Sequence, residues 1–236
     1  MSRSKLDCSK MPGHQDSIAV LVGQVSTRLF QHATKKRFKS RASLFQSGDY
    51  GDGCYRIESG VVKIILNSRE GEERIVSLEG PGSVIGELSL IDGMPRSASA
   101  VAVRDCEVLF VSRERFVACT QRDPKIFECL ATMLALRLRE ADEATAASSF
   151  MSVKARLARA FLDLAKHLGQ RHANGRIQLN QRVSQRDIAA LAGVARENVS
   201  RTLSGWNERK LITQSSRHYC IENASLLLRE INFAAH

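Results

Sequence analysis

The distribution of glycine limits the fold of this chain more than any other feature of its sequence. Nine of the fifteen glycines lie between residues 48 and 93. Short runs of β-branched and alternating apolar residues accompany them, at 60–66, 74–78 and 106–111. Runs of this kind, separated by glycine turns, are typical of antiparallel strands. We therefore predict a small antiparallel β-barrel or jelly roll over residues 36–111, within a domain that spans 18–121.

One segment of this barrel, residues 84–100, combines groups suited to binding an anion. Gly86 has no side chain, so a ligand can approach the backbone closely. The turn at 87–90 that follows can direct unpaired N–H groups at a phosphate, as the start of a helix does. Arg96 adds a planar, charged donor that can hold two phosphate oxygens at once, and Ser97 adds a hydroxyl donor.

Glu87 has a different role in this prediction, because an ionised carboxylate only accepts hydrogen bonds. In a pocket for a phosphodiester it would bind a sugar hydroxyl, and the 2′-hydroxyl of ribose fits this role. The candidate ligand-binding residues of the segment are Gly86, Glu87, Leu88, Arg96, Ser97 and Ala98. The alternative is a glycine-rich β-turn with a surface salt bridge.

A long helix is predicted after the barrel, because residues 125–149 contain neither glycine nor proline. Apolar and small residues recur there at alternating steps of four and three, which is typical of a coiled-coil seam. They are Phe127, Ala131, Leu134, Leu138, Ala141, Thr145 and Ser148. We predict that a helix over 122–149 pairs with its copy in a homodimer, although the stripe could instead pack on the barrel. A shorter amphipathic helix is expected before the barrel, at 18–30.

Positive charge is concentrated in the last third of the chain. The formal net charge is +10, and residues 150–236 hold 14 Lys and Arg against 6 Asp and Glu, which leaves +8 there and +2 before residue 150. A basic segment on a nearly neutral body indicates a polyanionic partner at one end. Nucleic acid is the first candidate and an anionic membrane the second, but no apolar stretch approaches the ~20 residues of a membrane-spanning helix.

Two short helices separated by a glycine turn are predicted within this basic segment. Ser184 and Asp187 form a capping box that begins the first helix, which ends at the next glycine. The second helix begins at Arg196, and its inward-facing positions, at steps of four and three, are apolar. Two β-runs, at 211–214 and 218–221, follow as a hairpin wing. This order predicts a winged helix-turn-helix.

The outer face of the second helix is polar and suited to reading bases. An arginine can bond guanine through two donors, and a carboxylate can accept from cytosine in the major groove. Side chains at the start of the first helix would lie over phosphates. The candidate DNA-binding residues are Ser184, Gln185, Arg186, Arg196, Glu197, Ser200 and Arg201. The alternative is a charged face that only contacts solvent.

In their order along the chain, these features resemble the Crp/Fnr family of bacterial transcription regulators, and within it the catabolite-activator type. The resemblance covers about residues 20–223 and rests on the 86–97 segment, the seam helix and the run Arg196-Glu197-Asn198-Val199-Ser200-Arg201. It implies an α+β fold of four parts. These are a disordered tail (1–17), a cyclic-nucleotide-binding jelly roll (18–121), a dimerisation helix (122–149) and a winged helix-turn-helix domain (150–236).

The resemblance also implies a function. A cyclic nucleotide, cyclic AMP in preference to cyclic GMP, would bind the sensor domain and control affinity for double-stranded DNA. The second helix would read a palindromic TGTGA-type site through Arg196, Glu197 and Arg201. RNA polymerase would contact the loop at 170–175.

Three residues depart from the pattern of the family. Ala141 and Asp142 stand where a Thr-Ser pair on the seam helix contacts the adenine in catabolite activators, and an alanine side chain cannot hydrogen-bond a base. Asp142 could accept from an exocyclic amine of adenine or guanine, or could be a solvated helix charge. Ala195 stands at the N-cap of the second helix, where Ser or Thr is usual, and the lost cap costs about 1 kcal/mol.

Several classes of protein are disfavoured by motifs that the sequence lacks. It contains no G-x-x-x-x-G-K-[ST], H-E-x-x-H or G-x-S-x-G, so we expect no enzyme. Its six cysteines are scattered, so we expect no metal and no iron–sulfur cluster. The N-terminus has no cleavable signal pattern, which favours a cytoplasmic location.

Two alternatives to ligand control stay open from the sequence. The pocket could be vestigial, so that DNA is bound without a ligand, because Ala141 removes the base contact. The chain could instead be a nucleotide-binding regulatory module whose C-terminal domain contacts another protein.

Overall fold

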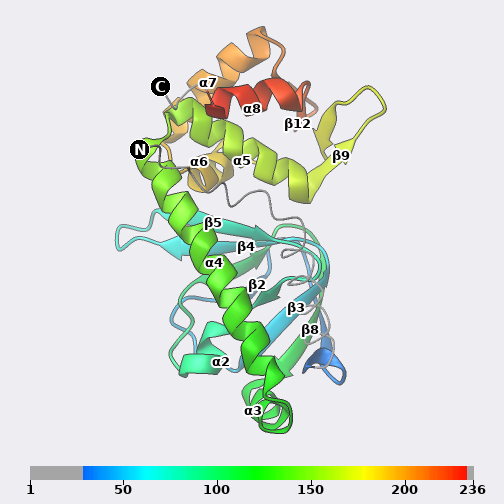
Figure 1. Ribbon diagram of the computed structural model, residues 1–236. Coiled ribbons are helices and arrows are strands. Elements are labelled where there is room, and N and C mark those ends of the chain that lie inside the picture. Colours follow the sequence, from blue (N-terminus) through cyan, green and yellow to red (C-terminus); the bar gives the residue numbers. More distant parts are fainter. Residues whose placement is uncertain (1–28, 233–236) are drawn as a thin grey trace, which may run out of the picture.

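The computed structural model describes residues 29–232. The tail predicted at 1–17 and nearly all of the helix predicted at 18–30 lie outside the described residues. Figure 1 shows a β-domain and a mainly helical C-terminal domain that are joined by one long helix, α4 (Lys125–Phe150). No helix within the described range is long and apolar enough to cross a membrane.

The β-domain is a jelly roll of two four-stranded antiparallel sheets, as the sequence predicts. One sheet has the strand order β1-β8-β3-β6 and the other β2-β7-β4-β5. The strands are β1 (Thr34–Phe38), β2 (Ser43–Phe45), β3 (Gly53–Ser59), β4 (Val62–Asn67), β5 (Glu73–Glu79), β6 (Val84–Ile85), β7 (Ser99–Ala102) and β8 (Cys106–Ser112). The inner faces of both sheets meet in a core that includes Tyr55, Ile57, Val62, Ile85 and Val108.

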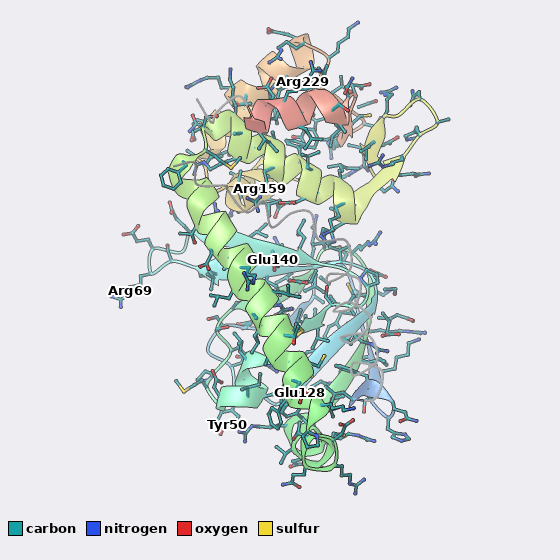
Figure 2. All side chains as sticks on the ribbon, viewed as in Figure 1. Tyr50, Arg69, Glu128, Glu140, Arg159 and Arg229 are labelled. Carbon is teal, nitrogen blue, oxygen red and sulfur yellow. The ribbon has the colours of Figure 1, made fainter. Side chains whose placement is uncertain are left out.

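Helix α4 confirms the long helix predicted after the barrel. It packs on the β-domain through Ile126, Cys129 and Leu130, which do not belong to the predicted seam. Within the seam, Phe127 is 49% exposed and Leu138 is 64% exposed. The alternative in which the seam packs on the barrel therefore fails for Leu138, whereas the Phe127 ring still contacts Phe116 of the β-domain, with 5.9 Å between ring centroids. In Figure 2, α4 crosses the front of the molecule with no other element covering it, and Glu128 and Glu140 are labelled on it.

Two shorter helices belong to the β-domain. Helix α2 (Leu88–Asp92) follows β6 and begins at the turn predicted for residues 87–90. Helix α3 (Arg113–Arg122) has no counterpart among the sequence predictions. Its first turn is stabilised by Ser112, whose hydroxyl accepts a hydrogen bond from the backbone N–H of Arg115 at 3.3 Å.

The C-terminal domain is a winged helix-turn-helix. Its elements are α5 (Val153–Leu168), β9 (Gly169–Arg171), β10 (Ile177–Leu179), α6 (Gln185–Ala192), α7 (Arg196–Glu208), β11 (Ile212–Ser215), β12 (His218–Ile221) and α8 (Ala224–Asn232). Helices α5 and α7 bury Leu157, Phe161, Val199, Leu203 and Trp206 in one core. The capping box predicted at the start of α6 is present.

Three details of this domain differ from the sequence predictions. The helix predicted from residue 150 to 168 does not continue α4: the extended backbone of Ser152 breaks it, and the Ser152 side chain caps α5. Residues 169–171, predicted as part of a turn, pair with β10 as a strand. Helix α8 was not predicted, and its buried Leu227 belongs to the core that α5 shares.

Candidate functional sites

Arg96 is buried in the β-domain, with an exposed fraction of 3%. Its guanidinium donates to the carboxylate of Asp52 at 2.8 Å and to the carbonyls of Gly53 and Gly86 at 2.6 and 2.7 Å. It also lies 4.4 Å from the ring centroid of Phe45. A cation removed from water needs such acceptors, so this network holds the guanidinium in one orientation.

Gly86 serves this arrangement directly. Its φ is +78°, a conformation that glycine adopts without strain. A Cβ at this position would lie 2.6 Å from Nη1 of Arg96. The sequence predicts that a ligand uses this space, but in the structure the missing side chain makes room for Arg96.

Glu87 is also buried, with an exposed fraction of 2%. Arg137 of α4 donates a hydrogen bond to Oε1 of Glu87 and another to the carbonyl of Val84. Arg137 was not among the residues predicted from the sequence. The one available signal was that a buried carboxylate needs a cationic partner, but a separation of 50 residues does not point to a particular one.

Glu87 and Arg96 each keep one buried polar atom without a hydrogen-bond partner among the described residues. These atoms are Oε2 of Glu87, an acceptor, and Nε of Arg96, a donor. Burial raises the pKa of the Cys54 thiol to about 12; Glu87 raises it further and Arg96 lowers it. Both charges therefore act on one buried thiol. An orphaned acceptor and donor are what a sugar hydroxyl and a phosphate would complement.

Glu87 and Arg96, which the sequence predicts to bind the sugar and the phosphate of one ligand, are directed to different partners in the structure. Glu87 is directed to Arg137 and Arg96 to Asp52. Neither residue lines either of the two cavities that the structure describes. The remaining residues of the segment lie around them: Leu88 and Ser97 are exposed and Ala98 is half-buried.

The seam helix places Ala141 on the face of Arg137 and Asp142 on another face, and both residues are exposed. Residues four apart lie on one face of a helix, so Ala141 lies one turn beyond Arg137. Asp142 lies one turn beyond Leu138, on the exposed side of α4, and is itself exposed. Asp142 therefore does not share the face that reaches Glu87.

The pair of Glu87 and Arg137 leads to a prediction about stability. Replacing Arg137 by Leu leaves the buried carboxylate without its charged donor, which should lower the free energy of unfolding by about 1 to 2 kcal/mol. Denaturant titration measures the loss. Arg139→Leu, the same change at an exposed position on the same helix, serves as the control. Equal stability of the two variants would contradict the prediction.

The candidate recognition helix α7 presents the predicted polar face. Arg196, Glu197, Ser200 and Arg201 are all exposed, whereas Val199 is buried. The N-cap residue, Ala195, makes no side-chain cap. The arrangement leaves the two arginines and the carboxylate free of the protein core, where they can contact base edges.

The residues at the start of α6 are not equally free. Ser184 accepts a hydrogen bond from the backbone N–H of Asp187 at 3.0 Å. The side chain of Gln185 hydrogen-bonds Tyr219 of the wing, and burial raises the pKa of that tyrosine. Arg186 is exposed, but Nη2 lies 3.9 Å from the carboxylate of Glu73 on β5.

A cleft of about 1010 Å³ lies between the β-domain and the winged domain. Its lining includes Arg41 after β1, Arg182 before α6 and Arg217 in the turn of the wing. In the described part of the chain, none of these three lies within 4.0 Å of a carboxylate. These three arginines were not predicted from the sequence, because they come from three separate segments of the chain.

No group of three or more His, Cys, Asp or Glu residues in the range 29–232 could hold a metal ion. The five cysteines in that range form no disulfide with one another. Burial raises the pKa of Cys106 and Cys129 as well as that of Cys54. These thiols therefore stay protonated at neutral pH and have the character of core residues.

Two family models match the chain. A cyclic nucleotide-binding domain matches residues 35–123, and a Crp-like helix-turn-helix domain matches residues 155–230. The first range contains Glu87 and Arg96, and the second contains α6, α7 and the wing.

Curated relatives extend the similarity over most of the chain. A cyclic AMP receptor protein of Thermus thermophilus is 39% identical over 190 residues, which are 80% of this chain and 84% of the relative. A CRP-like cAMP-activated global transcriptional regulator of Mycobacterium tuberculosis is 31% identical over 187 residues, 79% of this chain and 83% of the relative.

Solved structures show the same architecture. The c-di-GMP responsive global regulator CLP of Xanthomonas campestris superposes with a TM-score of 0.73 at 26% identity, covering 84% of this chain and 98% of CLP. A CRP-family transcriptional regulator of Thermus thermophilus gives a TM-score of 0.72 at 26% identity, covering 84% of this chain and 96% of the regulator.

Proposed function

Because this chain belongs to the Crp/Fnr family of transcription regulators, we propose that it is a homodimer whose affinity for operator DNA is controlled by a cyclic nucleotide. The observation that carries the proposal is the pair of orphaned buried atoms, Oε2 of Glu87 and Nε of Arg96. A folded chain that leaves both a donor and an acceptor unsatisfied loses stability. A ligand whose sugar hydroxyl and phosphate reached these two atoms would recover that loss.

Cyclic AMP is the ligand that we propose first, and cyclic GMP second. Arg96 would hold the phosphate, with Ser97 and the backbone of Gly86 beside it, and Glu87 would accept from the ribose hydroxyl. Relatives are named for cyclic AMP, whereas CLP is described as responsive to c-di-GMP. Isothermal titration calorimetry with all three nucleotides separates these ligands, and cyclic AMP is expected to bind most tightly.

The path from ligand to DNA runs through α4. Arg137 of α4 donates a hydrogen bond to Glu87. A ligand that also bonds to the Glu87 carboxylate would compete with Arg137 and so change the contact between α4 and the sensor domain. The exposed seam at Phe127 and Leu138 supports pairing of α4 with a second copy, which would place two α7 helices about 34 Å apart on DNA. In this proposal the dimer exchanges between a form that binds the operator poorly and a form that binds it well. Moving that equilibrium from 1:99 to 99:1 needs about 5.5 kcal/mol of differential affinity of the ligand for the two forms, shared between two sites.

The operator is proposed to be a palindrome of TGTGA-type half-sites, read by Arg196, Glu197 and Arg201. Gel-shift titrations on such a duplex, with and without cyclic AMP, test the whole proposal: the nucleotide is expected to raise affinity. Tight specific binding without any nucleotide would favour the vestigial pocket. Binding without sequence preference would favour a module that contacts protein.

The cationic cleft supports a DNA interface that continues past the half-site. If DNA flanking the operator crosses this cleft, Arg41 contacts phosphate, although it lies in the sensor domain. Arg41→Gln should then weaken binding only when the duplex extends ~10 base pairs beyond each half-site. In the dimer it should also reduce the slope of log K against log salt by about 2.

Arg115→Gln, at an exposed site on α3 and outside the cleft, is the matched control. An equal loss on short and long duplexes would contradict the flanking contact.

The loop at 170–175 is our proposed contact for RNA polymerase. Its substitution should lower transcription and leave operator affinity unchanged.

A further inference from the structure

Helix α6 of the winged domain packs directly on the sensor domain. Ile65 of β4, Ile75 of β5 and Ala190 of α6 form a buried cluster across the boundary. Figure 1 shows α6 lying against these strands. Since α6 also packs on α7 in the helix-turn-helix, the orientation of α6 on the sensor fixes the orientation of the recognition helix.

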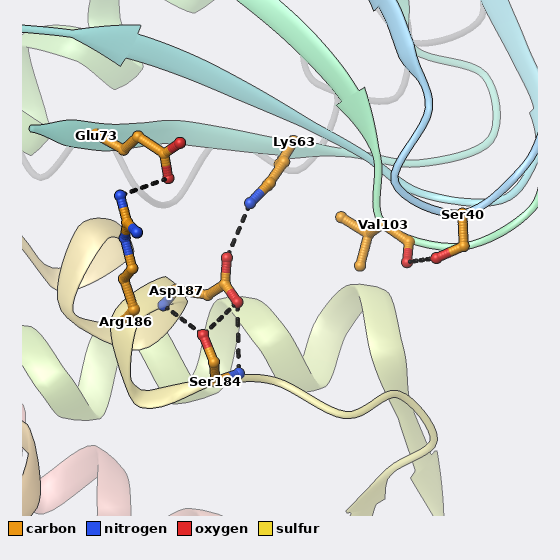
Figure 3. Close-up of polar contacts among 7 residues, drawn as sticks. All are labelled: Ser40, Lys63, Glu73, Val103, Ser184, Arg186 and Asp187. Atoms are coloured by element: carbon orange, nitrogen blue, oxygen red, sulfur yellow. Dashed lines mark hydrogen bonds and ion pairs between the residues drawn. The ribbon is translucent and has the colours of Figure 1, made fainter. Parts of the chain in front are cut away.

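An ion pair crosses the same boundary. Nζ of Lys63 on β4 donates to Oδ1 of Asp187 at 2.8 Å, and Figure 3 shows this bond beside the capping box. Burial works against ionisation of Asp187, but the hydrogen bonds from Lys63 and Ser184 outweigh it and lower the pKa of the carboxyl. Asp187 thus stays charged at neutral pH. Its carboxylate bonds to Ser184 within the winged domain and to Lys63 of the sensor.

A second contact fixes the other end of α6. Gly193 ends the helix with φ +62°, and a Cβ there would lie 1.4 Å from Nη1 of Arg74 on β5. Arg156 of α5 donates to the carbonyl of Gly193 at 2.9 Å. The sensor therefore touches both ends of α6, but only the contact of Lys63 is a hydrogen-bonded ion pair. At the other end, burial and the neighbouring charge of Arg156 lower the pKa of Arg74.

We propose that Lys63 is a positioning residue that locks α6 to the sensor and so limits the orientations that α7 takes in the nucleotide-free protein. This rests on the proposed function. Other contacts also cross the boundary: Val61, Leu78 and Val103 of the sensor pack against the core of the winged domain, and Arg186 lies 3.9 Å from Glu73. The covalent connection runs through residues 151 and 152, between α4 and α5. Without the lock the winged domain samples more orientations, and DNA must select among them.

Lys63→Met tests the lock, because it removes the ammonium and leaves the capping box of α6 intact. Operator affinity without nucleotide should fall about 5- to 10-fold, within the usual range of coupling between sites. The salt slope should not change, since Lys63 is not proposed to contact phosphate. Hydrogen exchange of the α6 amides should be faster in the free protein.

Lys39→Met is the matched control, because Lys39 forms an exposed pair with Asp105 at the same distance of 2.8 Å within the sensor alone. Lys63→Arg keeps the charge and should restore most of the affinity. Unchanged exchange at α6, or an affinity loss no larger than that of Lys39→Met, would overturn the lock. A fall of about 2 in the salt slope would overturn it in favour of a direct DNA contact.

The two proposals fail in different ways. Hydrogen exchange is measured with neither DNA nor nucleotide, so it reports on the lock alone. If the unsubstituted protein binds no operator while Lys63→Met still speeds exchange at α6, the proposed function fails and the docking contact stands.

Discussion

Replacement of Arg96 by Gln is expected to weaken cyclic AMP binding by about 100-fold. The guanidinium supplies the buried donor for the phosphate, and hydrogen bonds to charged groups contribute about 1.5 to 3 kcal/mol each. Glutamine has no charge and cannot form the planar two-point contact. Calorimetric titration with cyclic AMP measures the change, and the gel shift of the variant should no longer respond to the nucleotide.

A loss of folding must be separated from a loss of binding, because Arg96 also holds the carbonyls of Gly53 and Gly86. Asp52→Asn is the control: it weakens one partner of the guanidinium and keeps the guanidinium itself. The Asp52 side chain is 61% exposed, so the domain should stay folded and bind the nucleotide within a few-fold of the unsubstituted protein. A folded Arg96→Gln protein with unchanged cyclic AMP affinity would contradict the proposed pocket.

Replacement of Arg201 by Ala is expected to cost the most operator affinity. A bidentate contact from arginine to guanine is worth about 1 to 3 kcal/mol, and a homodimer loses it at both half-sites, about 2 to 6 kcal/mol in total. Gel shifts on the operator and on half-site variants measure both the affinity and the preference for guanine. The preference should relax at one base pair of each half-site.

Ser204→Ala provides the matched control on the same helix. The Ser204 hydroxyl donates to the carbonyl of Ser200 one turn earlier, at 3.1 Å, so it is occupied within the helix. Its loss should change operator affinity by less than about twofold, as expected for a surface change of up to 0.5 kcal/mol. If both variants keep the same affinity and the same base preference, α7 is not the recognition helix.

The elements of the fold were largely predictable because their signals are local. Glycine spacing and β-branched runs predicted the jelly roll, and the absence of glycine and proline predicted α4. The capping box at Ser184 and Asp187 predicted the start of α6 to the residue. Helices α3 and α8 were missed: nothing was predicted at their positions, and α8 is short and lies beyond the wing.

The candidate sites were predictable in part. The sequence placed Glu87 and Arg96 in one segment and α7 with its polar face outward. It did not identify Arg137, Lys63 or the cationic cleft. Each of these depends on a contact between elements far apart in the chain, 50 residues in the first case and 124 in the second.

The local sequence is enough to say which face of a strand or helix each side chain occupies, because the periodicity of the backbone sets this. What the tertiary structure decided is which of those faces meet. Glu87 meets Arg137 on α4, and Asp187, which the sequence assigned only to a cap, also meets Lys63 on the sensor. Such pairings follow from how two domains pack as bodies, and the spacing of residues along one chain does not encode that packing.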